Sequence, residues 1–298
     1  MMKQLHHFPS REPQAEPAPT AARRSHLLRR SQRCAVRALV AAVAVGLAAW
    51  ATPASAGPSA RDIMDKVSQT RRLSGSEAVI KMTIVNDKGQ TRERKLSMAT
   101  KLFDGGKTEK RIYRFLSPVD VEGTGVLVFD YETKADDVWV FLPALRKTRR
   151  IVSSQRSNNF MDSEFTYADL NIPALDDFKY QLVKEEKFGG EDCWVIDLLP
   201  SSDEVKSSEG YSKKTFWISK QKFAVRRGLY FDLDGKLLKE LKTENVKLLD
   251  DKHQRYRAMR MEMVNKQNGR RSVFDSEKVV FAPDTKDDYF TPRYLERK

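Results

Sequence analysis

The sequence predicts a mainly β protein of the α+β class, built as a single bent, incompletely closed antiparallel β-barrel. An N-terminal helix and a helix or loop cover are expected over an apolar cavity. Apolar and polar residues alternate with a period of two from Ser76 almost to the end, and short Gly-containing turns separate the runs. One long stretch without strand pattern lies at residues 153–177. A succession of about ten or more strands normally curls to bury its apolar face.

The N-terminal part of the chain differs in composition from the rest. A basic head is followed by an apolar stretch, Ala38 to Ala51, and by the small-residue sequence TPASAG. This order predicts a secretory signal peptide over residues 1–56, cleaved after Ala56. The apolar stretch is too short to span a bilayer, which needs about 20 residues. We therefore expect an exported protein whose folded part, residues 57–298, is a single β domain without a permanent anchor.

Removal of residues 1–56 changes the chemistry that the protein can use. The 298-residue chain has 54 Lys and Arg and 41 Asp and Glu. Eight of the basic and two of the acidic residues lie in residues 1–56, so the folded part keeps 46 basic and 39 acidic residues and a net charge of +7. It also keeps one histidine, His253, and one cysteine, Cys193, which excludes an intramolecular disulfide and a Cys/His zinc site. No metal or cofactor is predicted.

A short amphipathic helix is expected at the start of the folded part. Ser59 is placed to cap this helix, and Asp62 follows three residues later. The apolar residues at helical spacing are Ala60, Ile63, Met64 and Val67. One such helix is too short to fill the concave side of the predicted sheet, so residues 160–175 are expected to complete the cover.

The strands are predicted from the runs of alternating residues. In the first run Ile80, Met82 and Ile84 share one face, and Asp87 to Gly89 supplies a hairpin turn. The later runs are EKRIYRFLSP, TGVLVFDYE, DDVWVFLP, FKYQLVKEEKFGGEDCWVIDLLP, KKTFWISK, VRRGLYFDLDGKLLKELKTENVKL, YRAMRMEMVN and RSVFDSEKVVF. In YRAMRMEMVN the residues expected inward are Met259, Met261 and Met263, and those expected outward are Arg260 and Glu262. Successive runs are expected to pair in one long meander.

Catalytic chemistry finds little support in the folded part. His253 lies in the turn LLDDKHQR, where a solvated residue is expected, and Cys193 stands beside Trp194 in a strand as a core thiol. The acidic residues of MDSEFTYADL have no nucleophile or glycine-rich phosphate loop beside them; they are Asp162, Glu164 and Asp169. We expect these acids to cap a helix or bond to loop backbone, and we predict that the protein is not an enzyme.

The stretch from Val138 to Leu170 combines an apolar strand, a basic cluster and an aromatic loop. Leu142-Pro143 is predicted to end the strand, because proline cannot donate to a sheet ladder. Residues 153–170 are expected to fold over the barrel mouth as a flap. The basic cluster expected along the barrel rim consists of Arg146, Lys147, Arg149 and Arg150.

Three interpretations of this basic cluster stay open. It is a solvated strand end, a contact for an anionic headgroup or an acidic partner, or a set of ion pairs that holds the flap shut. In the last case the partners of Arg149 and Arg150 are Asp162, Glu164 or Asp169. Nucleic acid is disfavoured, because acidic residues are interspersed nearly everywhere else in the folded part.

The candidate ligand site is the mouth and interior of the predicted barrel. Large rings near a flap can both pack against an apolar ligand and move. The residues expected to line the cavity or the flap are Phe115, Trp139, Leu142, Phe160, Met161, Phe165 and Tyr167. Apolar inward positions are ordinarily core, and the shortage of covering helix is the observation that favours a cavity.

Three segments of the sequence resemble one protein family. They are YRFLSPVDVEGTGVLVFDY, DDVWVFLPALRKTRRI and NNFMDSEFTYADL, and the resemblance extends over most of residues 58–298. They are similar to the outer-membrane lipoprotein-sorting protein family, relatives of the periplasmic lipoprotein carrier. The matching positions are Phe115, Pro118, Gly123, Thr124, Gly125, Trp139, Leu142, Pro143, Arg149, Arg150, Ile151, Phe160, Asp162, Phe165, Tyr167 and Asp169. The resemblance implies a bent, open β-barrel whose cavity takes acyl chains, without catalytic activity.

The function that this resemblance implies is that of a periplasmic carrier. The carrier binds acyl chains of a lipid or lipoprotein and passes them between envelope partners, an inner-membrane exporter and an outer-membrane acceptor. No nucleic acid and no stable membrane span are expected, and the protein is expected to be a monomer. The alternative is an accessory or sensor subunit that docks an envelope transporter and whose cavity is only a core.

Overall fold

The structure is a computed structural model that describes residues 57–171 and 174–297. The predicted signal peptide, residues 1–56, and its cleavage after Ala56 lie outside the described residues. All described residues belong to one structural unit, Gly57–Lys298. None of the helices in these residues has the length and the apolar composition needed to cross a lipid bilayer.

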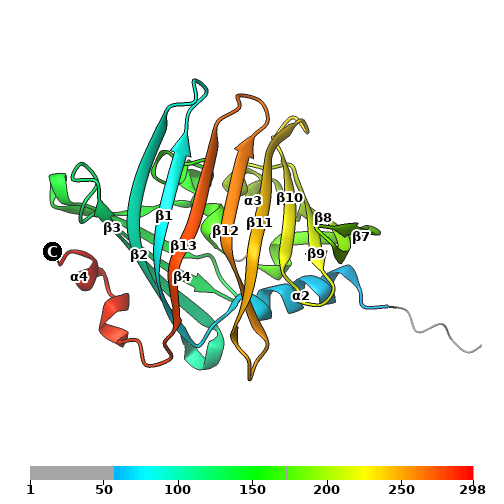
Figure 1. Ribbon diagram of the computed structural model, residues 1–298, viewed down its shortest axis with the longest axis horizontal. Helices are drawn as coiled ribbons and strands as arrows, with labels where there is room; N and C mark the ends of the chain where they lie inside the picture. Colours follow the sequence, from blue (N-terminus) through cyan, green and yellow to red (C-terminus); the bar gives the residue numbers. More distant parts are fainter. Residues whose placement is uncertain (1–56, 172–173, 298) are drawn as a thin grey trace, which may run out of the picture. The chain divides into compact units, whose positions relative to one another are not determined.

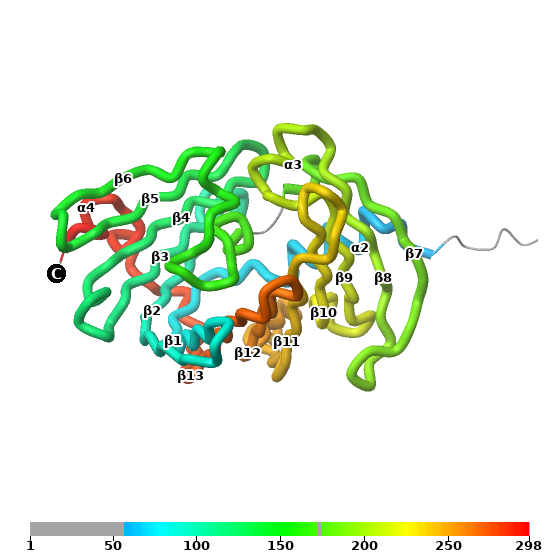
Figure 2. The backbone as a smooth tube through the Cα atoms, turned by 90° about the horizontal axis from the view of Figure 1, so that it is seen from above, coloured from blue at the N-terminus to red at the C-terminus, as the bar shows by residue number. Residues whose placement is uncertain are grey.

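Thirteen strands of the described chain form one bent antiparallel sheet (Figure 1). They are β1 (Gly75–Val85), β2 (Thr91–Phe103), β3 (Thr108–Ser117), β4 (Gly125–Tyr131), β5 (Asp137–Leu142), β6 (Lys147–Ile151), β7 (Phe178–Phe188), β8 (Glu191–Pro200), β9 (Lys213–Ser219), β10 (Val225–Phe231), β11 (Leu237–Asp250), β12 (Arg255–Asn265) and β13 (Arg271–Phe281). Their order is β6-β5-β4-β3-β2-β1-β13-β12-β11-β10-β9-β8-β7. Figure 2 shows β6 and β7 at opposite ends of an arc, so the barrel stays open, as the sequence predicts.

The strands pair as two meanders joined at the centre, and the prediction of a single meander is wrong. Strands β1 to β6 follow one another to one edge, and β7 to β13 return from the other edge until β13 pairs with β1. In this central pairing Met82 lies opposite Phe274. The chain leaves the sheet after β6 and returns to it at β7, on the opposite edge. The sheet is therefore completed only when the last strand, β13, pairs with the first, β1. Hairpin turns specify neighbouring strands only, and therefore do not specify this pairing.

The N-terminal helix has the cap and the buried face that the sequence predicts. Helix α2 spans Ala60–Arg71, and the Ser59 side chain accepts a hydrogen bond from the backbone N–H of Asp62, whose carboxylate accepts from Ser59 N–H. This capping box satisfies two of the free N–H groups at the helix start. The residues buried on its inner face are Ile63, Met64, Val67 and Thr70. The helix contacts β7 and β12, so it lies across the concave side of this half of the sheet.

A segment between β6 and β7 supplies the rest of the cover, and we call residues 153–171 the cover segment. Its short 3-10 turns are η3 (Ser153–Gln155), η4 (Phe160–Asp162) and η5 (Ala168–Leu170), and η6 (Leu175–Asp177) precedes β7. Figure 2 shows the segment inside the arc of the sheet. Its side chains that are buried in the main core are Phe160, Phe165, Tyr167 and Leu170. The prediction that this region completes the cover is confirmed for its described part.

A second short helix, α3 (Asp203–Glu209), was not predicted. Ser202 caps its start through the backbone N–H of Val205, and Gly210 ends it in the left-handed conformation with φ 76°. A Cβ atom on Gly210 would lie 2.7 Å from the Cβ of Ser157, so the helix end packs closely on the cover segment. The buried Glu209 carboxylate lies 3.5 Å from Arg156 of the same segment. Helix α3 therefore supports the cover from outside.

The outer face of the sheet carries an apolar cluster of its own. Its buried members are Ala99, Ile112, Leu127, Phe141, Phe290 and Leu295. The last two belong to the C-terminal elements η7 (Asp287–Phe290) and α4 (Pro292–Leu295), which lie beside β2 and β3 in Figure 1. A Cβ atom on Gly125 would lie 2.5 Å from Leu295 Cδ1, so glycine at this position of β4 permits the close approach of α4.

Candidate functional site

The concave face of the sheet encloses a cavity with a volume of about 190 Å³. Ile80, Met98, Met261 and Phe274 contribute to its apolar wall from β1, β2, β12 and β13, and Phe165 contributes from the cover segment. An apolar cavity of about 150 Å³ is large enough to bind benzene. The cavity therefore has room for part of an acyl chain. No group of three or more His, Cys, Asp or Glu side chains in the described residues is arranged to hold a metal ion.

One end of the cavity is strongly basic. The charged side chains in its wall are four cations and one carboxylate, namely Arg71, Arg111, Lys214, Arg257 and Asp169. Arg71 lies in the last turn of α2, Arg111 on β3 and Arg257 on β12, so three separate elements meet here. Lys214 is compensated by Glu209, whose carboxylate lies 2.6 Å from its Nζ.

Arg111 is a fixed member of this basic end. Its Nη1 donates to the carbonyl oxygen of Leu170, and its Nη2 donates to Asp130 at 2.5 Å and to Asn171 Oδ1 at 3.2 Å. Its Nε lies 3.8 Å from Glu109. Burial favours a lower pKa for Arg111, but the charges of Glu109 and Asp130 raise the pKa above its ordinary value. Arg111 therefore remains charged and ties β3 to the cover segment.

Arg71 and Arg257 are less well compensated. Arg257 Nη2 lies 3.6 Å from Glu109 Oε1, and its Nε and Nη2 are buried without a hydrogen-bond partner among the described residues. The Arg71 side chain makes no ion pair or hydrogen bond with a described residue. The pKa of Arg71 is lowered to about 10, first by burial and then by the positive charges of Arg257 and Arg111. Arg71 is still cationic at neutral pH.

Aromatic rings anchor the cover segment to both halves of the sheet. The fully buried ring of Phe160 has its centroid 6.0 Å from that of Tyr113 and 6.2 Å from that of Phe115, both on β3. On β13, Phe274 lies 6.3 Å from Phe160 and stacks on Phe165 at 4.4 Å. Such pairs contribute about 0.5–1.5 kcal/mol each beyond the burial of area. The cover segment is therefore an integral part of the core, and the prediction of a flap at the rim is corrected in this respect.

Buried polar contacts hold the centre of the cover segment at Glu164. Lys239 Nζ donates to the backbone carbonyl oxygen of Glu164 at 2.7 Å, and Asn265 Nδ2 donates to its carboxylate at 3.0 Å. Arg270 Nε lies 2.9 Å from the same carboxylate, and Ser272 Oγ accepts from the Glu164 N–H at 2.9 Å. Because Glu164 is 2% exposed, these contacts replace the water that its polar groups lose on folding.

The turn before Glu164 is held in an unfavourable backbone conformation. Met161 and Asp162 have φ values of 47° and 61°, in the left-handed region. Non-glycine residues lose about 1–2 kcal/mol each in this region. Arg94 on β2 donates to the carbonyl oxygen of Met161, and its Nη2 lies 3.5 Å from the Asp162 carboxylate. These contacts offset part of that cost and place the turn against the sheet.

The structure places the predicted cavity residues in three environments. Of these residues, only Phe165 lies in the wall of the concave cavity. Those that are buried in the main core beside the cavity, or pack against that core, are Phe115, Leu142, Phe160, Met161 and Tyr167. Burial raises the pKa of the Tyr167 hydroxyl, as expected for a ring in the core.

Trp139 lies on the opposite face of the sheet, and the prediction that it lines the cavity is wrong. Side chains alternate along β5, so Val138 and Val140 point into the main core while Trp139 packs on Phe129 of the outer face at 4.9 Å. The outer face is apolar here because residues 287–295 cover it. Alternation separates two faces, but does not tell which of two apolar faces is concave.

The basic cluster, which was predicted along the barrel rim, lies at the edge strand β6 of the open sheet. Strand β5 ends at Leu142, and Pro143 begins the 3-10 turn η2 (Pro143–Leu145) before the edge strand β6. The exposed basic residues of this region are Arg146, Lys147, Arg149 and Arg150. Arg150 forms an ion pair with Asp137 of β5. The other three make no ion pair with a described residue.

Arg149 and Arg150 do not hold the cover segment through its acidic residues, so that interpretation is wrong. Asp162 pairs with Arg94, and Glu164 with Arg270. Asp169 accepts a hydrogen bond from the Tyr211 hydroxyl at 3.0 Å. The acids of the cover segment point towards the concave face, whereas the basic cluster lies on the edge strand.

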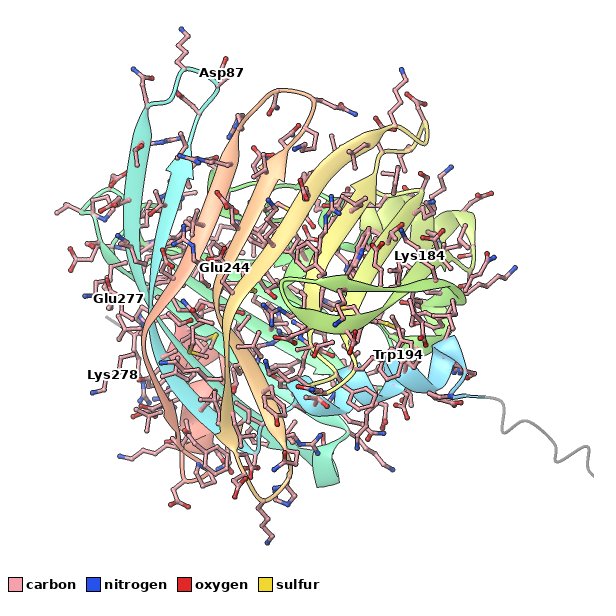
Figure 3. The ribbon with its side chains drawn as sticks, turned by 45° about the vertical axis from the view of Figure 1, so that its right-hand side comes forward. Asp87, Lys184, Trp194, Glu244, Glu277 and Lys278 are labelled. Atoms are coloured by element: carbon pink, nitrogen blue, oxygen red, sulfur yellow. The ribbon has the colours of Figure 1, made fainter. Side chains whose placement is uncertain are left out.

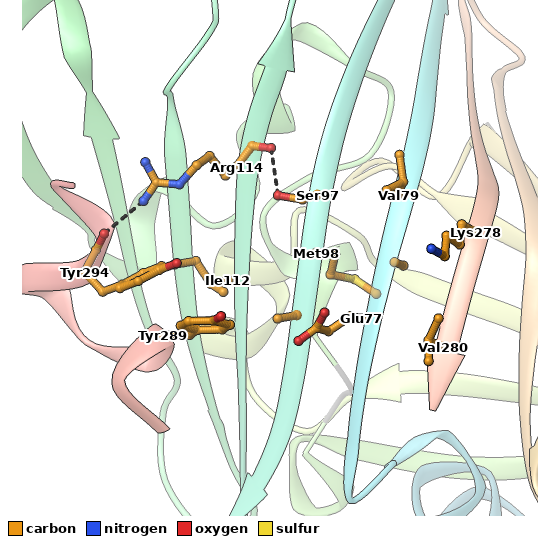
Figure 4. Close-up of a pocket in the computed structure, with 12 residues that line it drawn as sticks. Glu77, Val79, Ser97, Met98, Ile112, Arg114, Lys278, Val280, Tyr289 and Tyr294 are labelled. Carbon is orange, nitrogen blue, oxygen red and sulfur yellow. Dashed lines mark hydrogen bonds between the residues drawn. The ribbon is translucent and has the colours of Figure 1, made fainter. Parts of the chain in front are cut away.

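A second hollow of about 320 Å³ lies on the outer face of the sheet (Figure 4). Its wall includes Tyr289 and Tyr294, whose ring centroids are 4.8 Å apart, together with Glu77 and Lys278. Arg114 donates to the carbonyl oxygen of Tyr294 at 2.9 Å and so joins the C-terminal segment to β3. Because this hollow lies on the outer surface, whereas the concave cavity lies between the sheet and the cover segment, the concave cavity is the better candidate ligand site.

Sequence reasoning missed the basic end of the cavity. Arg71 follows Val67 by four residues, on the buried face of α2, and Arg111 precedes the inward Tyr113 by two residues on β3. Arg257 likewise precedes Met259 by two residues on β12. Each of these arginines stands at a position where the helix or strand periodicity expects an inward apolar residue. Because burial of a charge is costly, such a position indicates a functional or paired charge, and this signal could have predicted the basic end.

The fold defines a class of protein, the open antiparallel half-barrels with a covered concave face. A family model described as "-like: Uncharacterized protein" matches residues 107–297. A domain named as an outer membrane lipoprotein-sorting protein, from Vibrio parahaemolyticus, is 28% identical with a TM-score of 0.73, over 80% of this chain and 98% of that one. A DUF1329 family protein from Desulfovibrio piger is 27% identical with a TM-score of 0.72, over 79% of this chain and 97% of that one.

A more distant structure shares the fold. A LolA superfamily protein from Nitrosomonas europaea is 21% identical with a TM-score of 0.59, over 80% of this chain and 99% of that one. No curated protein matches the sequence. The chain belongs to the family of the model that matches residues 107–297, and it is similar to the outer membrane lipoprotein-sorting protein domain from Vibrio parahaemolyticus, as its motifs predict.

Proposed function

We propose that the protein is a periplasmic carrier, exported by a signal peptide over residues 1–56, that takes an acyl chain of a lipid or lipoprotein into its concave cavity. It passes this chain between an exporter of the inner membrane and an acceptor at the outer membrane. The observation that carries the proposal is the apolar cavity between the sheet and the cover segment. The similarity to the outer membrane lipoprotein-sorting protein domain supports it. Such a carrier works by binding and release, and uses neither a catalytic residue nor a cofactor.

Burial of methylene groups supplies the affinity that this function needs. Each methylene removed from water contributes about 0.8 kcal/mol, so about ten of them correspond to roughly 8 kcal/mol and a micromolar dissociation constant, before the costs of association. A cavity of about 190 Å³ takes part of a chain, and a longer chain needs its wall to adapt. Met98, Met259 and Met261 lie in that wall, and methionine is the most adaptable apolar side chain.

The second candidate function is an accessory or sensor subunit of an envelope transporter, whose cavity is only a core. The burial of Phe160 and Tyr167 favours this candidate, since their rings occupy concave space that a long acyl chain would use. The two functions differ in one observable property, the presence of a bound lipid.

Mass spectrometry of lipids extracted from the purified mature protein, residues 57–298, separates the two candidates. A carrier yields acyl lipid in amounts close to the protein concentration. Met261→Trp fills the cavity and should remove this lipid. Its matched control is Glu244→Trp, which adds the same ring to the outer side of β11, where the Glu244 side chain is 59% exposed (Figure 3). Absence of lipid from the wild type, or equal lipid in both variants, contradicts the carrier.

The basic cluster at the β6 edge is proposed to meet an anionic headgroup or an acidic partner during transfer. Arg146, Lys147 and Arg149 are exposed and carry uncompensated charge. The double variant Arg149→Gln and Arg150→Gln should lose association with anionic vesicles at low salt, where exposed charges act over about 10 Å or more, and keep its affinity for an acyl probe. If the double variant associates with anionic vesicles as well as the wild type does, the basic cluster is only a solvated strand edge.

A further inference from the structure

The basic end of the cavity carries more positive charge than its buried acids balance. We call the group at this end the arginine cluster; it consists of four arginines, Arg71, Arg72, Arg111 and Arg257, and two carboxylates, Glu109 and Asp130. Glu109 and Asp130 are 0% and 1% exposed. Four positive and two negative charges leave this largely enclosed group with an excess of positive charge, and the excess remains at one when Asp169, the carboxylate in the cavity wall, is counted. A low-dielectric site tolerates such an excess poorly.

Two of the four guanidinium groups are committed to the fold. Arg72 Nη1 donates to the carbonyl oxygen of Gly106 at 2.9 Å and its Nη2 lies 3.9 Å from Asp130. Arg111 donates to Asp130 and to the cover segment at Leu170. The excess charge therefore belongs to Arg71 and Arg257, which both lie in the cavity wall. Arg257 Nε and Nη2 are buried without a hydrogen-bond partner among the described residues, and Arg71 makes no hydrogen bond or ion pair with one.

Glu109 does not satisfy this capacity. Its carboxylate lies between Arg111 and Arg257, at 3.8 Å and 3.6 Å, and neither of its oxygens accepts a hydrogen bond from a described residue. A guanidinium group pairs best with a planar anion that accepts two parallel hydrogen bonds, a carboxylate or a phosphate. Arg71 and Arg257 lack such a partner among the described residues.

The arginine cluster is continuous with the apolar wall of the same cavity. Arg257, Met259 and Met261 follow at two-residue intervals on β12, and all three lie in the wall. A strand rises about 3.3 Å per residue, so Met261 lies about 13 Å from Arg257 along the strand. Phe274 and Phe165 border the cavity as well. The cavity thus has a cationic end and an apolar end in one enclosed space.

We propose that Arg71 and Arg257 bind the anionic head of an amphiphile, a carboxylate or a phosphate, whose acyl chain lies against Met259, Met261 and Phe274. Arg111 adds positive potential but keeps its contacts to the fold. This inference rests on the proposed carrier function and names the substrate class of the same cavity: an anionic, single-chain or partly inserted lipid, bound head first. A neutral lipid of equal chain length would leave both arginines uncompensated.

Binding of two ligands with the same chain tests the proposal. Palmitate carries the carboxylate, and methyl palmitate carries the same chain without the charge; each is measured by displacement of the neutral dye Nile red. The wild type should bind palmitate about tenfold to a hundredfold more tightly, as expected for a charge-assisted hydrogen bond in a shielded site. Arg71→Gln and Arg257→Gln should each remove most of this preference and leave methyl palmitate unchanged. Arg260→Gln is the matched control on the same strand, because Arg260 bonds to Asp275 on the outer face.

The outcomes separate this inference from the carrier function. Equal affinity of the wild type for the two ligands, or a preference that survives both cavity substitutions, overturns the inference alone. Binding of neither ligand overturns the carrier function. If inorganic phosphate binds the wild type as tightly as palmitate does, the site binds a free anion, and the proposal of an amphiphilic ligand is contradicted. Should Arg71→Gln fail to fold, Arg71→Lys keeps the charge, and it must then retain the preference for palmitate.

Discussion

Truncation of Phe160 to Ala tests whether the cover segment is a structural part of the core. The Phe160 ring is 0% exposed and has aromatic neighbours at 5.7–6.3 Å on β3, on β13 and within the cover segment itself. Loss of a buried phenyl ring costs about 3–5 kcal/mol in total, and the aromatic neighbours of Phe160 place it in the upper part of this range. We expect Phe160→Ala to lower the free energy of unfolding by about 4–5 kcal/mol.

Equilibrium unfolding in urea, followed by tryptophan fluorescence and circular dichroism, measures this loss. Phe290→Ala is the matched control, because Phe290 is 1% exposed but lies in the outer cluster, with Phe103 at 5.6 Å as its aromatic neighbour. We expect the control to lose about 3–4 kcal/mol, since it removes the same ring with fewer aromatic contacts. The two variants are thus expected to have similar free energies of unfolding. They should differ in which part of the protein becomes locally less stable.

Hydrogen exchange of the cover segment distinguishes those places. The backbone N–H groups of Tyr167 and Ala168 donate to Asn158 and Arg156 at 3.1 and 2.9 Å. These amides should exchange as slowly as the central strands in the wild type and in Phe290→Ala, and faster in Phe160→Ala. A loss below about 1 kcal/mol together with fast exchange of these amides in the wild type would mean that the cover is a loosely held flap, and the argument from its aromatic contacts would be refuted.

Three further outcomes are expected. Burial first, and the charge of Asp130 second, raise the pKa of Asp136 to about 7. The folded state then holds a proton that the unfolded state loses near pH 4, so the free energy of unfolding should fall as the pH rises from about 4 to 7. Asp136→Asn should remove this pH dependence, as measured by urea unfolding at several pH values. Gly75→Ala should lower the Tm, because a Cβ atom there would lie 2.2 Å from the carbonyl oxygen of Ala282; an unchanged Tm would contradict this clash. Cys193 is fully buried and burial raises its pKa, so it should react with a thiol reagent only after unfolding, and a fast reaction of the native protein would show that the thiol is accessible.

Elements with a local signal could be predicted from the sequence. Ser59 and Asp62 form the capping box of α2, and the inward phase of Ile80, Met82 and Ile84 on β1 is as expected. The strand end at Pro143 also follows from a property of one residue. In each case the neighbours that decide the conformation lie within a few residues along the chain, so the pattern contains the necessary information.

Features that depend on distant partners could not be predicted in the same way. The pairing of β1 with β13 joins strands nearly the whole folded chain apart, and no turn residue encodes it. Trp139 was assigned to the wrong face because the C-terminal elements that cover the outer face were not foreseen. The arginine cluster was missed because Arg71, Arg111 and Arg257 come from α2, β3 and β12, and their proximity exists only in the folded chain.

The cover segment links the stability of the core to the chemistry of the cavity. Its Phe160 and Phe165 complete the aromatic core, and its Leu170 and Asn171 accept hydrogen bonds from Arg111 of the arginine cluster. The same segment that borders the apolar end of the cavity therefore also fixes its basic end. Movement of the cover segment to admit a long chain would break aromatic contacts worth several kcal/mol and would release Arg111 at the same time. A ligand that supplies both an apolar chain and an anion can offset both losses, whereas a neutral chain can offset only the first.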